Sequence, residues 1–492
     1  YGVTADERPC KVVKDPVSIE DLHASIYRSL GIPHDYAEIF EKRPFYVTKD
    51  AKGRELATRL SVENGRIRIT VEADGAAYPI TVDPLVWALE QQVLGSDTAA
   101  EDLFGRSIAL VGNTAVIGSW QAAVAGKAGA GAAYVFVRSG TSWAEQAKLV
   151  AADAAADAAF GFSVALSGNT AVVGAVATSV AGKAGAGAAY VFVRSGTTWT
   201  QQAKLTAADA GADDSFAESV AIDGETVLVG SPYADVLGDG DRGAAYVFVR
   251  SGTTWSQQQK LAPSDGSGGD HAGAAVALSG DTALFGAPFA DVAGKSSAGA
   301  AYVYQRTGMS WSLQQKLSAS DGASTDGFGG AVALVNDTAL VGADQADVAG
   351  RLDSGAAYVF TRTGMAWAEQ QKLAPSTAVA SESFGIAVAL ASTSNTALIG
   401  AEGNPVGGAA YVFGRSGTTW TQQQQLVSPL VGADGNFGRG VGIDGDLALV
   451  GAPFSNLPSK PSAGVGISFA LSMTKGNGQG CVSAIECTSG FC

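Results

Sequence analysis

The most constraining feature of this sequence is an internal period. A tryptophan recurs every 56 residues from Trp87 to Trp367, and the next one, Trp420, follows after 53 residues. The tyrosine of a repeated "GAAY" stretch keeps the same phase, at Tyr134, Tyr190, Tyr246, Tyr302, Tyr358 and Tyr411. Aromatic residues that stay in phase over most of a chain indicate tandem structural repeats that stack on one another.

Each repeat contains four segments with the patterns of β-strands. The first, as in "FGFSVALSG", alternates large and small side chains, and the next two, "TAVVGA" and "GAAYVFVR", are apolar runs typical of a sheet covered on both faces. The fourth, "TWTQQAKL", is largely polar, and we expect its Gln and Lys side chains to discourage edge-to-edge pairing. The short "RSGTTW" link predicts a hairpin between the third and fourth strands.

The two ends of the repeated region indicate how the repeats close. The set of first, second and third strands occurs seven times, and the last set has no Trp strand after it. A single fourth strand, "VWALEQQVL" around Trp87, instead precedes the first set. We therefore predict an all-β fold over residues 86–472: a seven-bladed β-propeller of four-stranded blades, closed by this N-terminal outer strand.

The flanking segments differ in composition. Residues 1–60 predict a small α+β segment with one helix in "PVSIEDLHASIYRSLGIP", and residues 61–85 predict a β-hairpin that turns at Asp74-Gly75 and returns through Ile80 and Val82. Residues 473–492 form a cysteine-rich tail, which we interpret as an incomplete disulfide module.

The repeat resembles the FG-GAP repeat of integrin α-subunits, and it is more similar still to bacterial FG-GAP proteins with "GAAYVF" and "W…QKL" strands. The resemblance is carried by the "FG" steps, by "SVALSG" and by "GAP" at Gly286–Pro288 and Gly451–Pro453. It implies a secreted or cell-surface ring that is used for binding.

Residues 1–60 resemble the C-terminal tail of an uncharacterised bacterial family related to sulfatases and alkaline phosphatases. The similar stretches are "YGVTADE", "KDPVSIEDLHASIYRSLGIP" and "KDAKGREL". This resemblance implies either the end of a larger hydrolase fused to the propeller or a join made during sequence assembly, and both interpretations stay open.

Integrin propellers hold calcium between the first and second strands, but here that loop is reduced to turns such as "LSGDTA" and "IDGDLA". Calcium prefers six to eight oxygen ligands, which so short a turn does not supply. We therefore do not carry the family's metal site over. We interpret Asp281, Asp337 and Asp446 as turn residues that bond their own backbone.

Other carboxylates recur between blades. A first series follows the fourth strand, at Asp97, Asp153, Asp209, Asp265 and Asp321, and a second comes five residues later, at Asp102, Asp214, Asp270, Asp326 and Glu382. These acids are either turn formers or cation clamps. The densest cluster, Asp235, Asp239 and Asp241 in "ADVLGDGDRG", is our candidate metal site, with calcium as the candidate ion and no other cofactor expected.

The sequence offers little for catalysis. Only one of three histidines, His271, lies in the repeats, and no HExxH, Walker or GxSxG motif occurs, so we expect no enzyme and assign no catalytic residues. The formal net charge of −15 argues against a nucleic-acid partner. No run approaches the roughly 18 apolar residues of a transmembrane helix.

The leading hypothesis is a monomeric, secreted or surface-attached adhesion module that presents loops to protein or glycan partners. Blades three to six differ most between their second and third strands, so we expect a partner there. A structural scaffold or stalk is the alternative favoured by the near identity of blades one and two. A third hypothesis is an accessory domain of a larger hydrolase.

Overall fold

The structure is a computed structural model that describes residues 45–49, 58–63, 66–71, 81–393, 395–430 and 435–473. These residues form strands, turns and loops, and none of them forms a helix that is long and apolar enough to cross a membrane. One compact unit spans Leu89–Phe469, and β1, β2 and β3 belong to a second unit. The predicted N-terminal helix and the four cysteines lie outside the described residues.

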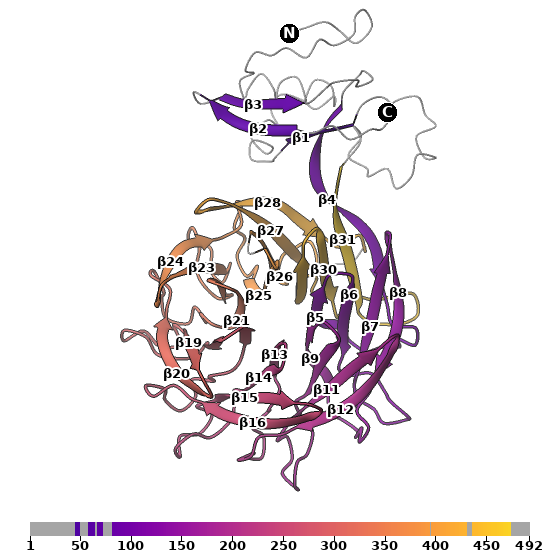
Figure 1. The fold of residues 1–492 in the computed structure, drawn as a ribbon, viewed down its shortest axis with the longest axis vertical. Coiled ribbons are helices and arrows are strands. Elements are labelled where there is room, and N and C mark those ends of the chain that lie inside the picture. The colour runs from indigo at the N-terminus through magenta and orange to yellow at the C-terminus, as the bar shows by residue number, and fades with distance from the viewer. Residues whose placement is uncertain are drawn as a thin grey trace, which may run out of the picture. The chain divides into compact units, whose positions relative to one another are not determined.

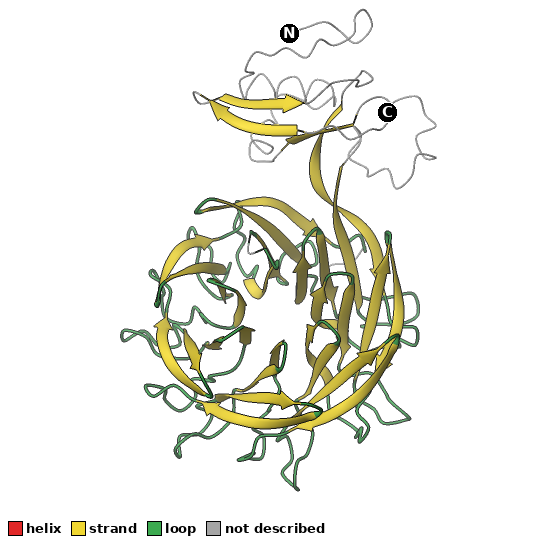
Figure 2. Ribbon diagram, in the orientation of Figure 1, coloured by secondary structure: helices red, strands yellow, loops and turns green. Residues whose placement is uncertain are grey.

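Within the described residues, Leu89–Phe469 form a ring of seven antiparallel blades (Figures 1 and 2). Blade one consists of β5 (Phe104–Val111), β6 (Thr114–Ser119), β7 (Ala132–Ser139) and β8 (Ser142–Leu149). Blade two consists of β9 (Phe160–Ser167), β10 (Thr170–Ala175), β11 (Ala188–Ser195) and β12 (Thr198–Leu205). Blade three consists of β13 (Ser219–Asp223), β14 (Thr226–Ser231), β15 (Ala244–Ser251) and β16 (Thr254–Leu261).

The remaining blades repeat this order. Blade four consists of β17 (Val276–Ser279), β18 (Thr282–Ala287), β19 (Ala300–Thr307) and β20 (Ser310–Leu317). Blade five consists of β21 (Ala331–Val335), β22 (Thr338–Ala343), β23 (Ala356–Thr363) and β24 (Ala366–Leu373). Blade six consists of β25 (Phe384–Leu390), β26 (Thr396–Ala401), β27 (Ala409–Ser416) and β28 (Thr419–Val427). Blade seven consists of β29 (Gly440–Asp444), β30 (Leu447–Ala452), β31 (Val465–Met473) and the end of β4 (Thr81–Val93).

The seventh blade confirms the predicted closure. Strand β4 supplies its outer strand next to β31, and the Ser468 hydroxyl donates to the Gln91 carbonyl at 3.3 Å. The same blade meets blade one through a parallel bridge between Gly464 and Phe104. The first and last strands of the ring therefore join its ends, as the single fourth strand in the sequence predicts.

The middle strands of each blade explain their apolar sequences. All six residues of β10, "TAVVGA", are buried, and so are the first five residues of β11. A strand that is buried along its whole length must be covered on both faces of its sheet. Each blade therefore stacks between two neighbours, and the predicted hairpin from third to fourth strand is present, for example between Ser195 and Thr198.

The "FG" step fills the junction between two blades. Phe160 at the start of β9 is fully buried, and its ring lies 5.5 Å from Tyr190 and 6.0 Å from Phe192 in edge-on contacts. Its backbone pairs in parallel with Gly131 of the preceding blade. The buried aromatic ring and this backbone bridge together fix the spacing of adjacent blades.

The glycine of the "GAP" segment is required by this junction. A Cβ atom on Gly286 would lie 1.8 Å from the carbonyl oxygen of Gly329 on the next blade, and one on Gly118 would lie 1.9 Å from that of Gly161. No other residue fits such an approach of two backbones. The glycine that these segments share with the family motif is therefore required sterically.

The outer strands bind each other through glutamine, which corrects our interpretation of these residues as protection against edge pairing. The Gln315 amide accepts from the Trp367 backbone N–H at 2.9 Å and donates to its carbonyl at 2.8 Å. The Trp367 indole also donates to Gln314 at 3.1 Å. The sequence pattern did not show this role because the partner lies on the neighbouring blade.

The N-terminal strands correct the predicted hairpin within residues 61–85. Strand β3 (Arg66–Val71) pairs with the preceding β2 (Thr58–Glu63), and not with a strand that returns through Ile80 and Val82. The first residues of β4 pair instead with β1 (Phe45–Lys49). The proposed domain boundaries at 60, 85 and 472 stay predictions.

We predict that Gly286→Ala destabilises the ring. The new Cβ would meet the Gly329 carbonyl at 1.8 Å, and such overpacking costs about 1–3 kcal/mol or more, because the two blades must separate. The midpoint of thermal unfolding should fall by several degrees. Gly322→Ala is the matched control, since its Cβ meets nothing closer than 3.4 Å. Equal midpoints for the two variants would contradict the steric explanation.

Candidate functional site

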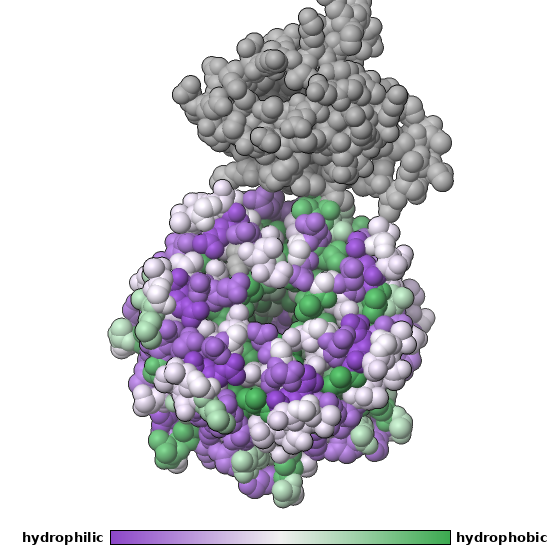
Figure 3. Space-filling view, viewed as in Figure 1, coloured by the Kyte–Doolittle hydropathy of each residue, from purple (hydrophilic) through white to green (hydrophobic). Residues whose placement is uncertain are grey.

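The strand register gives the ring two different faces. The turns from first to second strand and from third to fourth strand lie at one end of each blade, which we call the turn face. The loops from second to third strand and from fourth strand to the next blade lie at the other end, the loop face. The ring has a central opening, surrounded by polar and apolar residues (Figure 3).

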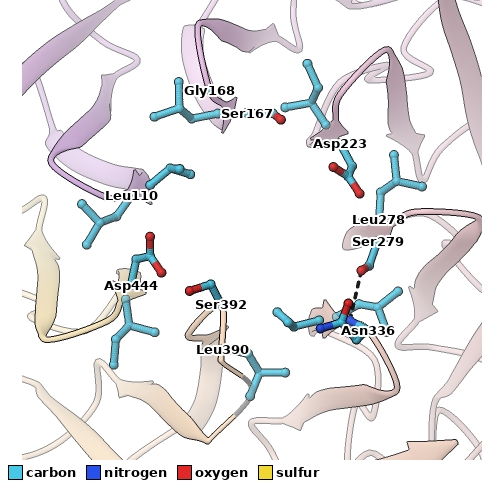
Figure 4. A pocket seen from close by; sticks show the side chains of 16 residues that line it. Leu110, Ser167, Gly168, Asp223, Leu278, Ser279, Asn336, Leu390, Ser392 and Asp444 are labelled. Carbon is cyan, nitrogen blue, oxygen red and sulfur yellow. Dashed lines mark hydrogen bonds between the residues drawn. The ribbon is translucent and has the colours of Figure 1, made fainter.

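At the turn face the central channel widens into a cavity of about 440 Å³ lined by leucines such as Leu110 and Leu278 (Figure 4). Its polar side chains form hydrogen bonds between neighbouring blades. Asp223 accepts from the Gly280 N–H at 2.7 Å, and Asp444 accepts from the Gly112 N–H at 2.7 Å. These carboxylates tie blade three to blade four and blade seven to blade one.

The turn-face aspartates correct one of our interpretations. Asp281 and Asp337 do not bond their own turns; they form ion pairs with Arg306 and Arg362 of the third strands, at 2.6 and 2.7 Å. Asp446 is exposed at the equivalent turn of blade seven. The short turns therefore hold arginine at the two positions where an integrin-like loop would hold calcium.

The first acidic series forms ion pairs between blades. Asp321 accepts from Lys372 at 2.7 Å and from the Tyr358 hydroxyl at 2.8 Å. Burial opposes ionisation of Asp321, but these two hydrogen bonds outweigh it and lower its pKa. Four further pairs repeat the arrangement: Lys148–Asp97, Lys204–Asp153, Lys260–Asp209 and Lys316–Asp265.

The second acidic series caps its own loops, which favours the turn interpretation over a cation clamp. Asp326 accepts from the Ala323 N–H at 2.8 Å, and Asp270 accepts from the Ser267 N–H at 2.8 Å. Burial raises the pKa of both carboxyls, and the N–H bonds oppose that shift. The carboxylates of both series therefore bond to other groups of the protein itself.

The candidate calcium loop is also internally bonded. Asp239 forms an ion pair with the buried Arg242 at 3.1 Å, and Asp235 accepts from the backbone N–H of Asp241 at 3.2 Å. Among the described residues, no group of three or more His, Cys, Asp or Glu side chains is arranged to hold a metal ion. Calcium binding at this loop stays a prediction, which thermal unfolding in millimolar calcium and in chelator would test.

The loop face holds a cluster that the sequence analysis missed. Five charged side chains from five different blades lie near enough for their charges to affect one another's pKa; we call this set the charged mouth, and its members are Arg106, Glu218, Asp344, Glu402 and Arg439. Arg439 forms an ion pair with Glu402 at 2.8 Å. Burial raises the pKa of Glu218 and of Asp344, which indicates that water is partly excluded from this mouth.

Arg106 is the most strained charge of the mouth. Burial, and then the nearby Arg439, lower its pKa to about 10, although Glu218 and Glu402 oppose the shift. Its guanidinium lies 3.8 Å from the ring centre of Phe162, and its Nε–H is buried without an acceptor. A buried, incompletely bonded cation is costly for stability.

Aromatic side chains flank the charged mouth. Trp120 packs edge-on against Phe162 at 5.7 Å. His271 lies between Tyr233 and Phe289, at 4.7 and 4.9 Å between ring centres, and we call these three residues the aromatic triad. Tyr233 and Phe289 are 37% and 43% exposed.

The repeat itself contained a signal for this cluster. Two residues after each junction phenylalanine, or the residue in its place, the sequence changes from blade to blade, through Arg106, Phe162, Glu218, Ala274, Gly330, Ile386 and Arg439. A position that varies inside an otherwise constant motif is not subject to the packing between blades that keeps the rest of the motif constant. The members of the charged mouth lie on separate blades, so no cluster of charges along the chain indicates them.

We predict a pH-dependent contribution from the interblade ion pairs. Because the pKa of Asp321 is lowered in the folded ring, its stabilisation is present above the unfolded value of about 3.9 and is lost as the pH falls through the lower folded value. Asp321→Asn should lower the free energy of unfolding at pH 7 by less than about 1 kcal/mol, because the ion pair is exposed, and the unfolding midpoint should fall slightly. The difference in unfolding midpoint between the wild type and Asp321→Asn, measured over pH 2–7, should shrink below about pH 4. A difference that stays constant with pH would contradict this account.

Comparison with known proteins places the repeats in a family. The FG-GAP repeat family matches residues 87–136, 143–192, 199–248, 255–304, 311–360, 367–413 and 420–465. Among curated proteins, none matches the chain. Among solved structures, one chain titled "Crystal Structure of Mitotic Checkpoint Complex" is similar, with a TM-score of 0.48, 10% identity, and coverage of 79% of this chain and 95% of that chain.

The family segments agree with the structure. Each begins on the outer strand of one blade and ends in the third strand of the next, so the seven segments include the outer strand around Trp87 that closes the ring. They cover well over half of the sequence. With its "FG" junctions, its "GAP" glycines and its closed seven-bladed ring, the chain belongs to the FG-GAP repeat family.

Proposed function

We propose that the chain is a non-catalytic binding module, secreted or attached to a cell surface, that binds a protein or glycan partner through its loop face. The observation that carries the proposal is the charged mouth with its aromatic neighbours. Unlike side chains converge there from different blades, and Arg106 keeps a buried donor without a partner. Such convergence is typical of recognition sites on propellers and other rigid scaffolds.

The contrast with the rest of the ring supports this assignment. On the perimeter and the turn face, charges are used in pairs that repeat from blade to blade, such as Arg306–Asp281 and Lys316–Asp265. A repeated pair serves every blade equally and therefore stabilises the ring. The charged mouth does not repeat, so a structural requirement shared by all blades does not explain it.

The chemistry of the loop face favours binding over catalysis. His271, the one histidine of the repeats, is packed between two aromatic rings, and burial lowers its pKa. A hydrolytic nucleophile needs a base beside it, and no serine or cysteine bonds to this imidazole among the described residues. The extracellular location is part of the proposal and is supported by the cysteine-rich end of the sequence.

We predict that changing Asp235, Asp239 and Asp241 together to Asn abolishes partner binding. These carboxylates stand in the loop beside His271, where the Asp241 backbone carbonyl accepts from the backbone N–H of His271 at 3.2 Å. Fluorescently labelled full-length chain would be applied to a panel of cell-surface glycans and glycoproteins. We expect the variant to bind at least tenfold more weakly than the wild type, which corresponds to a loss of about 1.4 kcal/mol or more of binding free energy.

The controls separate binding from folding. Because Asp239 pairs with the buried Arg242, a second variant changes only Asp235 and Asp241, which keeps that ion pair. A control variant on the turn face replaces the exposed Asp446 by Asn. Unchanged binding in the loop variants, with equal unfolding midpoints, would remove this loop from the site. Binding lost only in the turn-face variant would place the partner on the other face.

A further inference from the structure

The junction between blades six and seven has the same three positions as the aromatic triad, but two of the three rings are missing. These positions hold Gly403, Asn436 and Phe454. A cavity of about 430 Å³ opens there on the loop face, and within the described residues it is lined by Asn436, Phe454, Asn456 and Ser462; we call it the blade-seven pocket. Phe454 is 42% exposed. Where the triad packs ring on ring, this junction therefore offers one exposed ring with an open space beside it.

Asn456 departs from a pattern that three other blades keep. In blades three, four and five an aspartate at this position accepts the backbone N–H of the residue six positions later, at 3.2, 2.9 and 3.0 Å; these are Asp235, Asp291 and Asp347. The Oδ1 atom of Asn456 accepts the Ser462 N–H in the same way at 2.9 Å. The amide adds an Nδ2 donor and removes the charge, and the shared loop geometry requires neither change. This donor has no acceptor among the residues that the structure describes, so it is available to a ligand.

The Asn436 amide is oriented by two residues of the charged mouth. Its Nδ2 atom donates to Glu402 at 3.1 Å, and Glu402 forms the ion pair with Arg439 at 2.8 Å. This bond leaves the Oδ1 acceptor of Asn436 without a donor within the described part of the chain. The left-handed backbone of Asn436 does not by itself require an asparagine, because Leu103 and Ala159 adopt the same conformation at this position of their blades. The Asn436 amide is therefore a second polar group available to the pocket.

We propose that the blade-seven pocket binds one neutral sugar ring, an inference that rests on the proposed binding function and names its ligand class. The C–H face of a pyranose packs on an exposed aromatic ring such as Phe454. A sugar hydroxyl both donates and accepts, so neighbouring hydroxyls can bond to the Asn456 donor and to the Asn436 acceptor. The described lining holds no charged side chain, which favours an uncharged ligand. The volume lies within the range of about 300–1,000 Å³ that is typical of ligand sites.

The test titrates the full-length chain with methyl glycosides of glucose, mannose, galactose and N-acetylglucosamine, and with adenosine as a flat ring that is not a sugar. Saturation-transfer NMR and calorimetry should detect binding of at least one glycoside. Asn456→Asp restores the residue of blades three to five, so it should keep the loop and the unfolding midpoint and yet weaken binding about tenfold or more. Phe454→Ala should weaken binding by a similar factor. Leu352→Ala removes a 67% exposed side chain from the equivalent loop of blade five, and this control should bind as the wild type does.

The other outcomes separate the sugar class, the pocket and the binding function. Glycoside binding that neither Asn456→Asp nor Phe454→Ala weakens would overturn the blade-seven pocket as the site. Binding of adenosine without binding of any glycoside would overturn the sugar class. If no glycoside binds but the panel of cell-surface glycoproteins still retains the chain, the sugar inference fails and the binding function stands. Binding to neither the glycosides nor that panel would overturn the binding function as well.

Discussion

The whole ring depends on one contact, the approach of the "FG" backbone of each blade to the glycine of the "GAP" segment before it. At Gly286 and Gly451 a Cβ atom would lie 1.8 Å from the next blade's carbonyl oxygen. The buried phenylalanine then fills the space beside this contact with edge-on aromatic packing. Because the last junction, between Gly464 and Phe104, is built in the same way as the others, the ring closes without a special element.

Around this junction the polar side chains form successive ties between blades. Serines of the inner strands bond to the next "FG" carbonyl, as Ser219 does to Gly273 at 2.8 Å, and glutamines join the outer strands. Lysine–aspartate pairs join the loops between the blades. A rigid ring results, and rigidity is what a binding surface made of loops requires, because pre-ordered loops lose less entropy on binding.

The charges of the loop face do not follow the pairing that repeats from blade to blade elsewhere in the ring. Arg106 keeps a buried N–H without an acceptor, and its pKa is lowered to about 10, mainly by burial. Blades one and two are nearly identical in sequence, yet they supply Arg106 and Phe162 at the same position of the motif. Such a change within a nearly constant repeat lowers stability and gives one blade a side chain that the others lack. Functional sites commonly show this pattern.

The sequence by itself determined the strand order, the seven blades and the closing strand, because strand periodicity, turn residues and steric glycines act over a few residues and repeat in phase. It did not reveal the charged mouth, since Arg106 and Glu218 lie on different blades and only the closed ring brings their charges near one another. It also misjudged the outer glutamines, whose partners lie on the neighbouring blade, and the partner of the Arg66–Val71 strand, which pairs with β2. Local patterns fix which strands form; only the closed ring decides which side chains meet.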